Sequence, residues 1–419
     1  MDSRHSARYA SAMTTSRPVA RFLDRSTAPH VATLVAVTGL SALAMNIFLP
    51  SLPAMTDWFA TDYRLMQLSV SLYLGVSAGL QIVIGPISDR FGRRPVLLWS
   101  VVLFLIATAG TLFAPTVGVF LAFRMMQAVV AAGMVLSRAV IRDMVPANEA
   151  ASMIGYVTMG MAFVPMVGPL VGGKLEELFG WQASFACLFL IGLATLWLVL
   201  RDLGETRQGE KVRFAEQGAQ YPELLRSPRF WGYSSAAACI SGAFFAYLGG
   251  GPFIGSEIFH LAPATLGLYL SAPAVGYAAG NFLSGRYAAR VGLDPMVLAG
   301  SAIVALAMAT LALLGLAGLA GPNLFFGLMI FLGLGNGIAL PSANAGILSV
   351  RPAIAGAASG LGGALMIGGG AAISAATGAA LSPDAGGAAL TALAAIMCAS
   401  AIGGVLSILF VMSRNRRRA

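Results

Sequence analysis

The charged residues best placed to do chemistry stand close together in the stretch GPISDRFGRRPVL, residues 85–97. Only 10% of the chain is charged, yet four charged residues fall within six positions here: Asp89, Arg90, Arg93 and Arg94. A carboxylate beside guanidinium groups forms ion pairs, and it is also stabilised at the positive N-terminal end of a helix. The stretch therefore predicts a site of ion pairing or of contact with a helix end.

Two glycines and a proline give this stretch its expected shape. Gly85 and Gly92 permit close backbone approach and a tight turn, and Pro95 is suited to the first turn of the next helix. We therefore expect a short turn between two helices. A simpler interpretation, in which the arginines only mark a cytoplasmic loop, leaves Asp89 and the glycines unexplained.

Arg124 is a second candidate, because it is the only basic residue well inside a long apolar run. A charge at membrane depth costs at least about 2.5–3.5 kcal/mol on insertion scales, so it should face a cavity or a partner. Gln127 follows one helical turn later, in the sequence RMMQ. Two interpretations remain open: a role in binding substrate or moving protons, and a role in helix packing or snorkelling.

The elements that position these residues must be membrane helices. Of the 419 residues 58% are hydrophobic and only 10% are charged, whereas soluble domains carry roughly 25% charged residues. Apolar runs of about 18 residues or more recur along the chain, and alternation of period two, which a barrel would need, does not. The first 28 residues are polar and Arg-rich without an apolar core, which argues against a cleavable signal peptide.

The apolar runs predict twelve membrane spans, and the basic residues orient them. All Lys and Arg residues except Arg64, Lys174 and Arg124 fall on the side of the termini, so both termini are expected in the cytoplasm. This placement explains the net charge of +9 better than a nucleic-acid partner does. The expected spans are 30–51, 66–87, 95–114, 117–138, 149–172, 182–201, 229–250, 264–285, 295–316, 322–345, 354–378 and 387–412.

A polar stretch in the middle divides the spans into two sets of six. We expect a cytoplasmic tail (1–28), a first six-helix half (29–201), a cytoplasmic linker (202–228), a second half (229–412) and a basic cytoplasmic tail (413–419). The halves also share a motif at a constant offset: Gly85/Gly285, Arg90/Arg290, Gly92/Gly292 and Pro95/Pro295. A duplicated chain of this kind predicts a cavity between the halves near the membrane midplane.

The stretch 85–95 resembles the loop signature G-x-L-S-D-R-x-G-R-R of the major facilitator superfamily, with Ile87 in place of Leu. The segments MQLSVSLYLGVSAGLQIVIGPISDRFGRRPVLL and SRAVIRDMVPANEAASM are similar to Bcr/CflA-type drug-resistance exporters, and the similarity runs from about residue 40 to 410. The resemblance implies an all-α membrane protein of two pseudo-symmetric halves. It also implies multidrug efflux by proton antiport and alternating access in a bacterial inner membrane.

The resemblance also assigns roles to residues. Asp89 would help to lock the outward-facing state by meeting the start of the eleventh helix, near Ala353 to Gly356, with Arg138 or Arg142 as its cationic neighbour. Arg124 and Gln127 match the R-x-x-Q of the fourth helix, which is tied to proton transfer or substrate contact. The fifth span matches the antiporter signature at Pro165, Gly168, Pro169, Gly172 and Gly173.

One position departs from the family pattern, because relatives commonly carry an acid where this chain has Asn46. None of the 17 acidic residues of the chain lies deep inside a predicted span. Proton coupling is then expected to use Asp57, Asp62 or Glu257 at the outer mouth, or a substrate that is itself protonated. Because Arg124 lacks an obvious acidic partner, an anionic or zwitterionic substrate is a further hypothesis.

The remaining composition argues against an enzyme, since the three histidines lie near loops and the three cysteines stand singly in apolar segments. We expect no catalytic residue, cofactor or metal, and a monomer in lipid that binds small drug-like molecules and protons but no nucleic acid. Export or uptake of one specific metabolite, such as an anionic one, is the alternative. The residues expected to bind substrate are Asn46, Tyr73, Arg124, Gln127, Tyr247, Tyr277 and Asn336.

Overall fold

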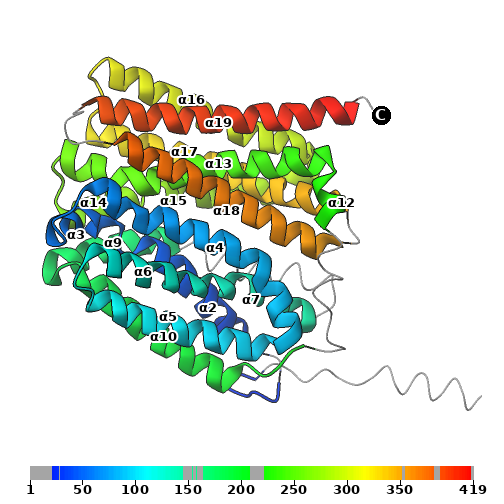
Figure 1. Ribbon diagram of the computed structural model, residues 1–419. Helices are drawn as coiled ribbons and strands as arrows, with labels where there is room; N and C mark the ends of the chain where they lie inside the picture. Colours follow the sequence, from blue (N-terminus) through cyan, green and yellow to red (C-terminus); the bar gives the residue numbers. More distant parts are fainter. Residues whose placement is uncertain are drawn as a thin grey trace, which may run out of the picture.

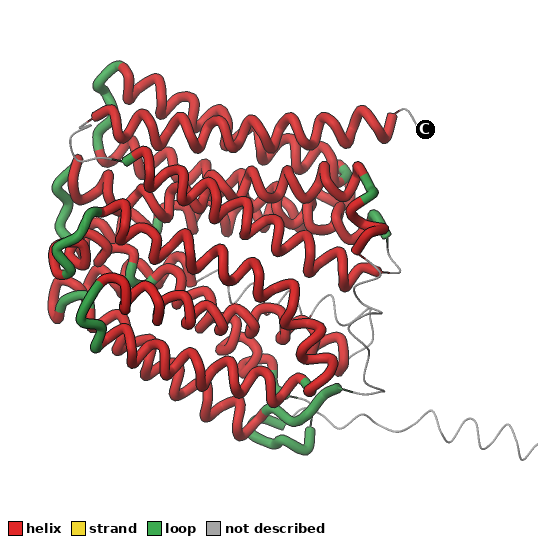
Figure 2. The backbone as a smooth tube through the Cα atoms, in the orientation of Figure 1, coloured by secondary structure: helices red, strands yellow, loops and turns green. Residues whose placement is uncertain are grey.

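The structure is a computed structural model that describes residues 21–27, 29–144, 153, 157, 164–207, 221–351, 354–381 and 387–416. Within these ranges every regular element is a helix, and short loops join the helices at their ends (Figure 2). Because lipid offers no hydrogen-bond partner to a backbone, helices are the economical way to satisfy each peptide group internally. The all-α class expected from the composition is confirmed.

Two sets of helices follow one another along the chain (Figure 1). The first half comprises α2 (Val31–Asn46), η1 (Leu49–Ser51), α3 (Leu52–Trp58), α4 (Tyr63–Phe91), α5 (Arg93–Leu112), α6 (Val117–Gln127), η2 (Ala128–Ala131), α7 (Ala132–Met144), α9 (Val164–Phe179) and α10 (Gln182–Asp202). The second half comprises α13 (Pro228–Phe253), η3 (Ile254–Ile258), α14 (Pro263–Leu270), α15 (Ala272–Val291), α16 (Leu293–Leu316), α17 (Pro322–Ser349), α18 (Ala355–Ala380) and α19 (Gly387–Arg416), and the short α12 (Tyr221–Leu225) precedes it.

Ten helices among the described residues are long and apolar enough to cross a membrane. The two remaining predicted spans have separate explanations. Span 149–172 lies partly outside the described residues, and its second part is α9. Span 264–285 is divided at Ser271 into α14 and α15. The chain is therefore a multi-pass membrane protein with the expected twelve-helix arrangement.

The bundle has two ends, which we name by what they carry. The terminal end carries the start of α2 and the ends of α10 and α19, and the distal end carries the loops that follow α3, α5 and α16. In Figure 1 the first half lies below the second, with the distal end at the left. The halves meet chiefly along two helix pairs, α4 with α18 and α9 with α14.

The stretch 85–95 is more helical than the sequence suggests. Helix α4 continues to Phe91, and α5 begins at Arg93, so the turn is the single residue Gly92 with φ of 98°. A Cβ on Gly92 would also lie 2.4 Å from a carboxylate oxygen of Glu205. Gly85 instead sits within α4, where a Cβ would meet open space, so the expected close approach at Gly85 is wrong.

The second half repeats this turn. Helix α15 ends at Val291, α16 begins at Leu293, and Gly292 alone turns the chain with φ of 95°. Positive φ values of this size are open to glycine and strained for other residues. The shared turn, at the offset found in the sequence, supports the duplication of the two halves.

Candidate functional site

Arg124 is enclosed among the helices of the first half, with a relative exposure of 1%. Its Nε donates to Ser69 O at 3.2 Å, and Nη2 donates to Ala44 O at 2.7 Å. The guanidinium also lies over the rings of Phe48 and Tyr73, at 4.3 and 4.2 Å from their centroids. The charge is therefore stabilised by main-chain oxygens and aromatic faces.

Gln127 extends this arrangement to a third helix. Its Oε1 accepts from Arg124 Nη1 at 2.7 Å, and its Nε2 donates to Thr108 Oγ1 at 2.8 Å. Gln127 and Thr108 are fully buried. Together the contacts of Arg124 and Gln127 join α2, α4, α5 and α6, so the structure favours the helix-packing interpretation of Arg124 in this conformation.

The two buried asparagines make matching local bonds. Asn46 Nδ2 donates to Ala42 O at 2.8 Å and Asn336 Nδ2 donates to Leu332 O at 2.9 Å, each to the preceding turn of its own helix. Both side chains are 3% exposed, and both Oδ1 atoms lack a hydrogen-bond partner. Each therefore keeps an acceptor available for a ligand donor.

Tyr247 and Tyr277 lie away from the Arg124 cluster. Tyr247 is fully buried in the second half and donates to Tyr269 O at 3.4 Å. Tyr277 is half-buried on α15, where its backbone faces Gly337 of α17. Among the described residues, no hydrogen bond or ring contact joins these two tyrosines or Asn336 to Arg124.

A charged cluster occupies the terminal end of the first half. Arg93 Nη1 lies 2.6 Å from Asp89 Oδ1, and its Nε lies 3.1 Å from Asp143 Oδ2 on α7. These three side chains are 11–23% exposed, so solvent screens them less than it screens surface pairs. The cluster ties the end of α4 to the start of α5 and the end of α7.

Glu205 completes this cluster, and the sequence interpretation missed it. Its Oε1 accepts from Arg93 N at 2.9 Å and its Oε2 from Arg94 N at 3.2 Å, so the carboxylate caps the start of α5. Arg94 Nε donates to Leu203 O at 2.8 Å. A carboxylate just beyond a predicted span, as in the sequence GETR, is the signal that could have indicated this cap.

The other arginines of the predicted gate lie at the same end. Arg90 is placed over the ring of Phe91, and Arg138 donates to Met134 O of its own helix. The nearest atom to a Cβ built on Gly356, in the first turn of α18, is Arg142 Nη1 at 3.5 Å. Of the helix start predicted to meet Asp89, residues 353 to 356, only residue 353 lies outside the described residues.

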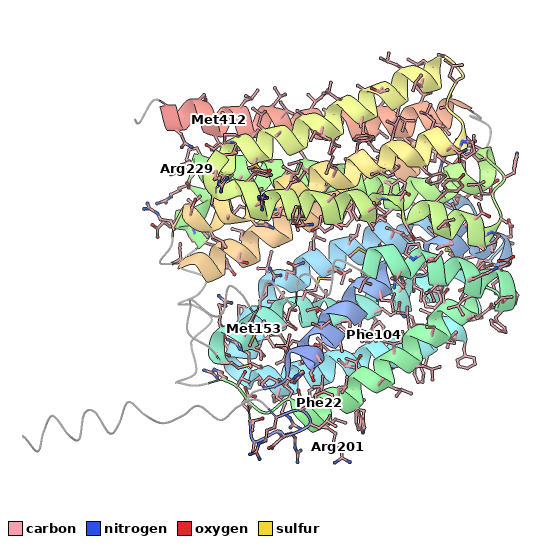
Figure 3. The ribbon with its side chains drawn as sticks, turned by 180° about the vertical axis from the view of Figure 1, so that it is seen from behind. Phe22, Phe104, Met153, Arg201, Arg229 and Met412 are labelled. Atoms are coloured by element: carbon pink, nitrogen blue, oxygen red, sulfur yellow. The ribbon has the colours of Figure 1, made fainter. Side chains whose placement is uncertain are left out.

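The segment before α2 is attached to the first half rather than extended away from it. The buried carboxylate of Asp202, at the end of α10, accepts from Leu23 N at 2.7 Å and His30 N at 2.8 Å. Figure 3 shows Phe22 beside Arg201 at this end, with Arg229 and Met412 at the terminal end of the second half. Part of the expected N-terminal tail is therefore docked.

At the distal end, three side chains of α4 bind main-chain oxygens of the second half. Tyr63 Oη donates to Gly249 O at 2.9 Å, and Arg64 Nε donates to Leu381 O at 3.0 Å. Gln67 Nε2 donates to both Ser374 O and Ser374 Oγ at 2.9 Å. Side-chain hydrogen bonds between the halves that join two described residues all belong to this group, which we call the distal seal.

The antiporter signature on α9 makes the second contact between the halves. A Cβ on Gly173 would lie 2.4 Å from Pro263 O, and a Cβ on Gly267 would lie 2.3 Å from Pro169 O. A Cβ on Gly172 would lie 1.7 Å from Ile47 O within the first half. Small residues thus bring α9 into backbone contact on two sides. The side chain of Pro165 lies outside the described residues.

Replacing Gly173 with alanine is expected to open the distal end. The new methyl group would need about 1 Å more separation from Pro263 O to reach an ordinary van der Waals contact. Pro263 O is a backbone atom, so it cannot rotate away as a side chain could. Spin labels on Phe113→Cys and Leu319→Cys, one on each half and both largely exposed, should then report a longer distance in a protein free of native cysteines. The control is Gly79→Ala, where nothing lies within 4 Å. An unchanged distance in Gly173→Ala would contradict the expectation.

Comparison with known proteins places these features in context. A family model described as Major Facilitator Superfamily matches residues 34–375. The chain is 34% identical over 213 residues to a chloramphenicol resistance protein of Pseudomonas aeruginosa, covering 50% of each chain. It is 31% identical over 255 residues to an uncharacterised MFS-type transporter of Bacillus subtilis, covering 59% of this chain and 63% of that one. The match thus spans half to under two thirds of these relatives.

A longer match joins the chain to a bicyclomycin resistance protein homolog of Haemophilus influenzae, with 27% identity over 343 residues, 81% of this chain and 86% of the relative. Among solved structures, a D-xylose-proton symporter aligns with a TM-score of 0.69 at 18% identity, covering 91% of this chain and 96% of the other. An inward-facing, occupied bacterial homolog of the human lysosomal transporter Spinster aligns equally well, with coverage of 92% and 96%. These structures share the fold.

Proposed function

Because the chain belongs to the Major Facilitator Superfamily, and is thus a transporter rather than an enzyme, we propose that it exports small amphipathic, drug-like compounds in exchange for protons. The names of the chloramphenicol and bicyclomycin resistance relatives support this substrate class. The two halves, 29–201 and 229–412, would rock against each other, with residues 202–228 as the connection between them. Transport would then follow alternating access.

The observation that carries this proposal is the distal seal. Its hydrogen bonds run from Tyr63, Arg64 and Gln67 to oxygens of the second half, at one end of the bundle. Hydrogen bonds between the halves that lie at one end can break without disturbing the packing inside either half. That is what an alternating-access cycle requires of its gate.

We place the terminal end in the cytoplasm of a bacterial inner membrane. Arg64 and Lys174 are at the distal end, and Arg124 is enclosed within the bundle. The other Lys and Arg residues lie on the terminal side of the spans in the sequence, as the positive-inside rule expects for a cytoplasmic face. The distal seal would then close the outer face, and the protein would act as a monomer.

The charged cluster at the terminal end would hold the opposite gate. Asp89 is already oriented by Arg93 at 2.6 Å, and Arg142 approaches the first turn of α18. A carboxylate brought to that helix start would gain roughly 0.3–1 kcal/mol, and more when partly buried. Asp89 would thus favour the conformation in which the terminal end is closed.

The proposed substrate-binding residues are Asn46, Tyr73, Arg124, Gln127, Tyr247, Tyr277 and Asn336. The unpartnered acceptors of Asn46 and Asn336 support direct contact with a ligand donor. Arg124 and Gln127 would act through the positions of Phe48 and Tyr73, because their own polar groups are already bonded. This arrangement gives an anionic metabolite little access to the guanidinium, which favours amphipathic drugs as substrates.

Expression of the chain in cells without endogenous drug pumps should lower the accumulation of chloramphenicol or ethidium several-fold. A protonophore should restore the accumulation, because it removes the driving gradient. An abundance-matched Asp89→Asn variant, in which transport is expected to be strongly reduced, serves as the control. Efflux that persists with the protonophore would contradict proton exchange, and increased accumulation would indicate uptake instead.

A further inference from the structure

The carboxylates at the distal end differ in burial. Asp57, Asp62, Glu177 and Glu257 are exposed, whereas Glu176 is half-buried. Glu177 also pairs with Lys174, at 2.7 Å between Nζ and Oε2. Of the carboxylates described at this end, Glu176 therefore differs most in surroundings from a carboxylate in water. The sequence favoured Asp57, Asp62 or Glu257 and passed over it.

Glu176 lies on the face of α9 that packs against the first helix. Gly168 and Gly172 precede it by two turns and one turn, and four-residue spacing places all three on one face. A Cβ on Gly168 would meet Asn46 Cβ at 3.4 Å, and a Cβ on Gly172 would meet Ile47 O. One turn further, the carboxyl group of Glu176 faces Ser51 of η1.

The carboxyl group is enclosed on one side. Glu176 Oε2 and Ser51 Oγ are both buried. Burial disfavours the ionised form, because water no longer stabilises the charge, and this effect is larger than the opposing effect of the Ser51 hydroxyl. A protonated carboxyl group has an O–H that can donate to the serine oxygen facing it.

The surroundings of Glu176 contain little other charge. Neither α2 nor η1 carries a titratable side chain, and α14 carries only Tyr269. The charged residues of α10 and α15 lie in the last turns of those helices. They are more than about 20 Å along the helix axis from the first residue of each helix. The titratable or charged groups on the elements packed against α9, and on α9 and α3 themselves, are Lys174, Glu177, Asp57, Cys187, Arg201, Asp202, Tyr269, Tyr277, Arg286, Tyr287 and Arg290.

We propose that Glu176 is the group that binds a proton when the distal end closes, which links proton uptake to the transport cycle. The same helix carries Gly173, whose backbone contact with Pro263 closes the distal end. When α9 is separated from α14 and η1, water reaches the carboxyl group and favours its ionised form. On closing, the carboxyl group takes one proton from the outer solution, so acid favours the closed conformation. Exchange then requires that this proton leaves toward the cytoplasm before the distal end opens again. The inference deepens the proposed proton exchange and rests on it.

The distance between spin labels at positions 113 and 319 tests the proposal on the full-length protein without any substrate. In the parent protein, the ratio of closed to open distal ends should rise about tenfold from pH 8 to pH 5, since the closed form has the higher proton affinity. Glu176→Gln should be closed at both pH values. Glu177→Gln, one residue away and exposed, should behave like the parent.

Glu176→Ala provides the second variant, because it removes the titrating group without supplying an amide for Ser51. Its closed-to-open ratio should also be independent of pH, at whatever value it takes. A parent-like pH response in either Glu176 variant overturns the proposal. Absence of drug-driven proton movement in the parent would instead overturn the proposed exchange, while the label distances would still decide the role of Glu176.

Discussion

Replacing Arg124 with lysine is expected to remove most of the folded protein from the membrane. Lysine keeps the charge but is a compact ammonium group, which cannot present planar faces to Phe48 and Tyr73 while donating in three directions. Each buried acceptor left without a donor costs about 1–3 kcal/mol. Ser69 O, Ala44 O and Gln127 Oε1 are the acceptors at risk.

The total stability of a domain is only about 5–15 kcal/mol, so such a loss is large. Fluorescence-detected size-exclusion of a tagged protein, with a thermal ramp, measures the effect. Arg138→Lys is the matched control, because Arg138 is exposed and its hydrogen bond within the described part of the chain goes to Met134 O of its own helix. If Arg124→Lys kept normal abundance and melting but lost one class of substrate, Arg124 would act on the substrate directly.

Asp89→Asn is expected to reduce transport about five- to thirtyfold while leaving abundance unchanged. A carboxylate that is partly buried at a helix start contributes up to about 2 kcal/mol, which sets the size of the effect on two nearly balanced conformations. The fold should survive because Arg93 keeps its contact with Asp143 at 3.1 Å. Drug efflux normalised to protein abundance is the measurement.

Asp143→Asn separates the two possible origins of this effect. It removes the other carboxylate from Arg93, but it lies on α7 and not on the segment assigned to the gate. We expect it to retain most of the transport activity. Equal losses in both variants would assign the effect to the pairing of Arg93 and not to a contact with α18.

Much of the fold could be predicted from hydropathy and from the side on which the basic residues fall. The predicted ends of the helices were less accurate, because a helix continues after its residues become polar. Helix α4 begins at Tyr63 and ends at Phe91, three and four residues beyond the predicted span 66–87. The hydrogen bonds of the backbone, which hydropathy does not measure, decide where a helix ends.

The candidate site was harder to predict because many of its partners are main-chain atoms. Arg124 was identifiable as a basic residue inside an apolar run, but two of its acceptors are the carbonyl oxygens of Ala44 and Ser69. Any residue can supply a carbonyl oxygen, so the sequence carries no sign of these contacts. Glu205 escaped notice for another reason, since its value as a helix cap depends on the path of the chain after α10.

The distal seal has the same character, since each of its donors reaches a peptide oxygen in the second half. A peptide oxygen remains after nearly any substitution at its own position. The residues of the second half that closure restricts are glycines 249 and 378, where a Cβ would collide with Gln67, and Gly267, where it would collide with Pro169 O. The second half can therefore diverge in its side chains, and so in the molecules it accepts, without loosening closure. An engineer seeking altered specificity should diversify that half first.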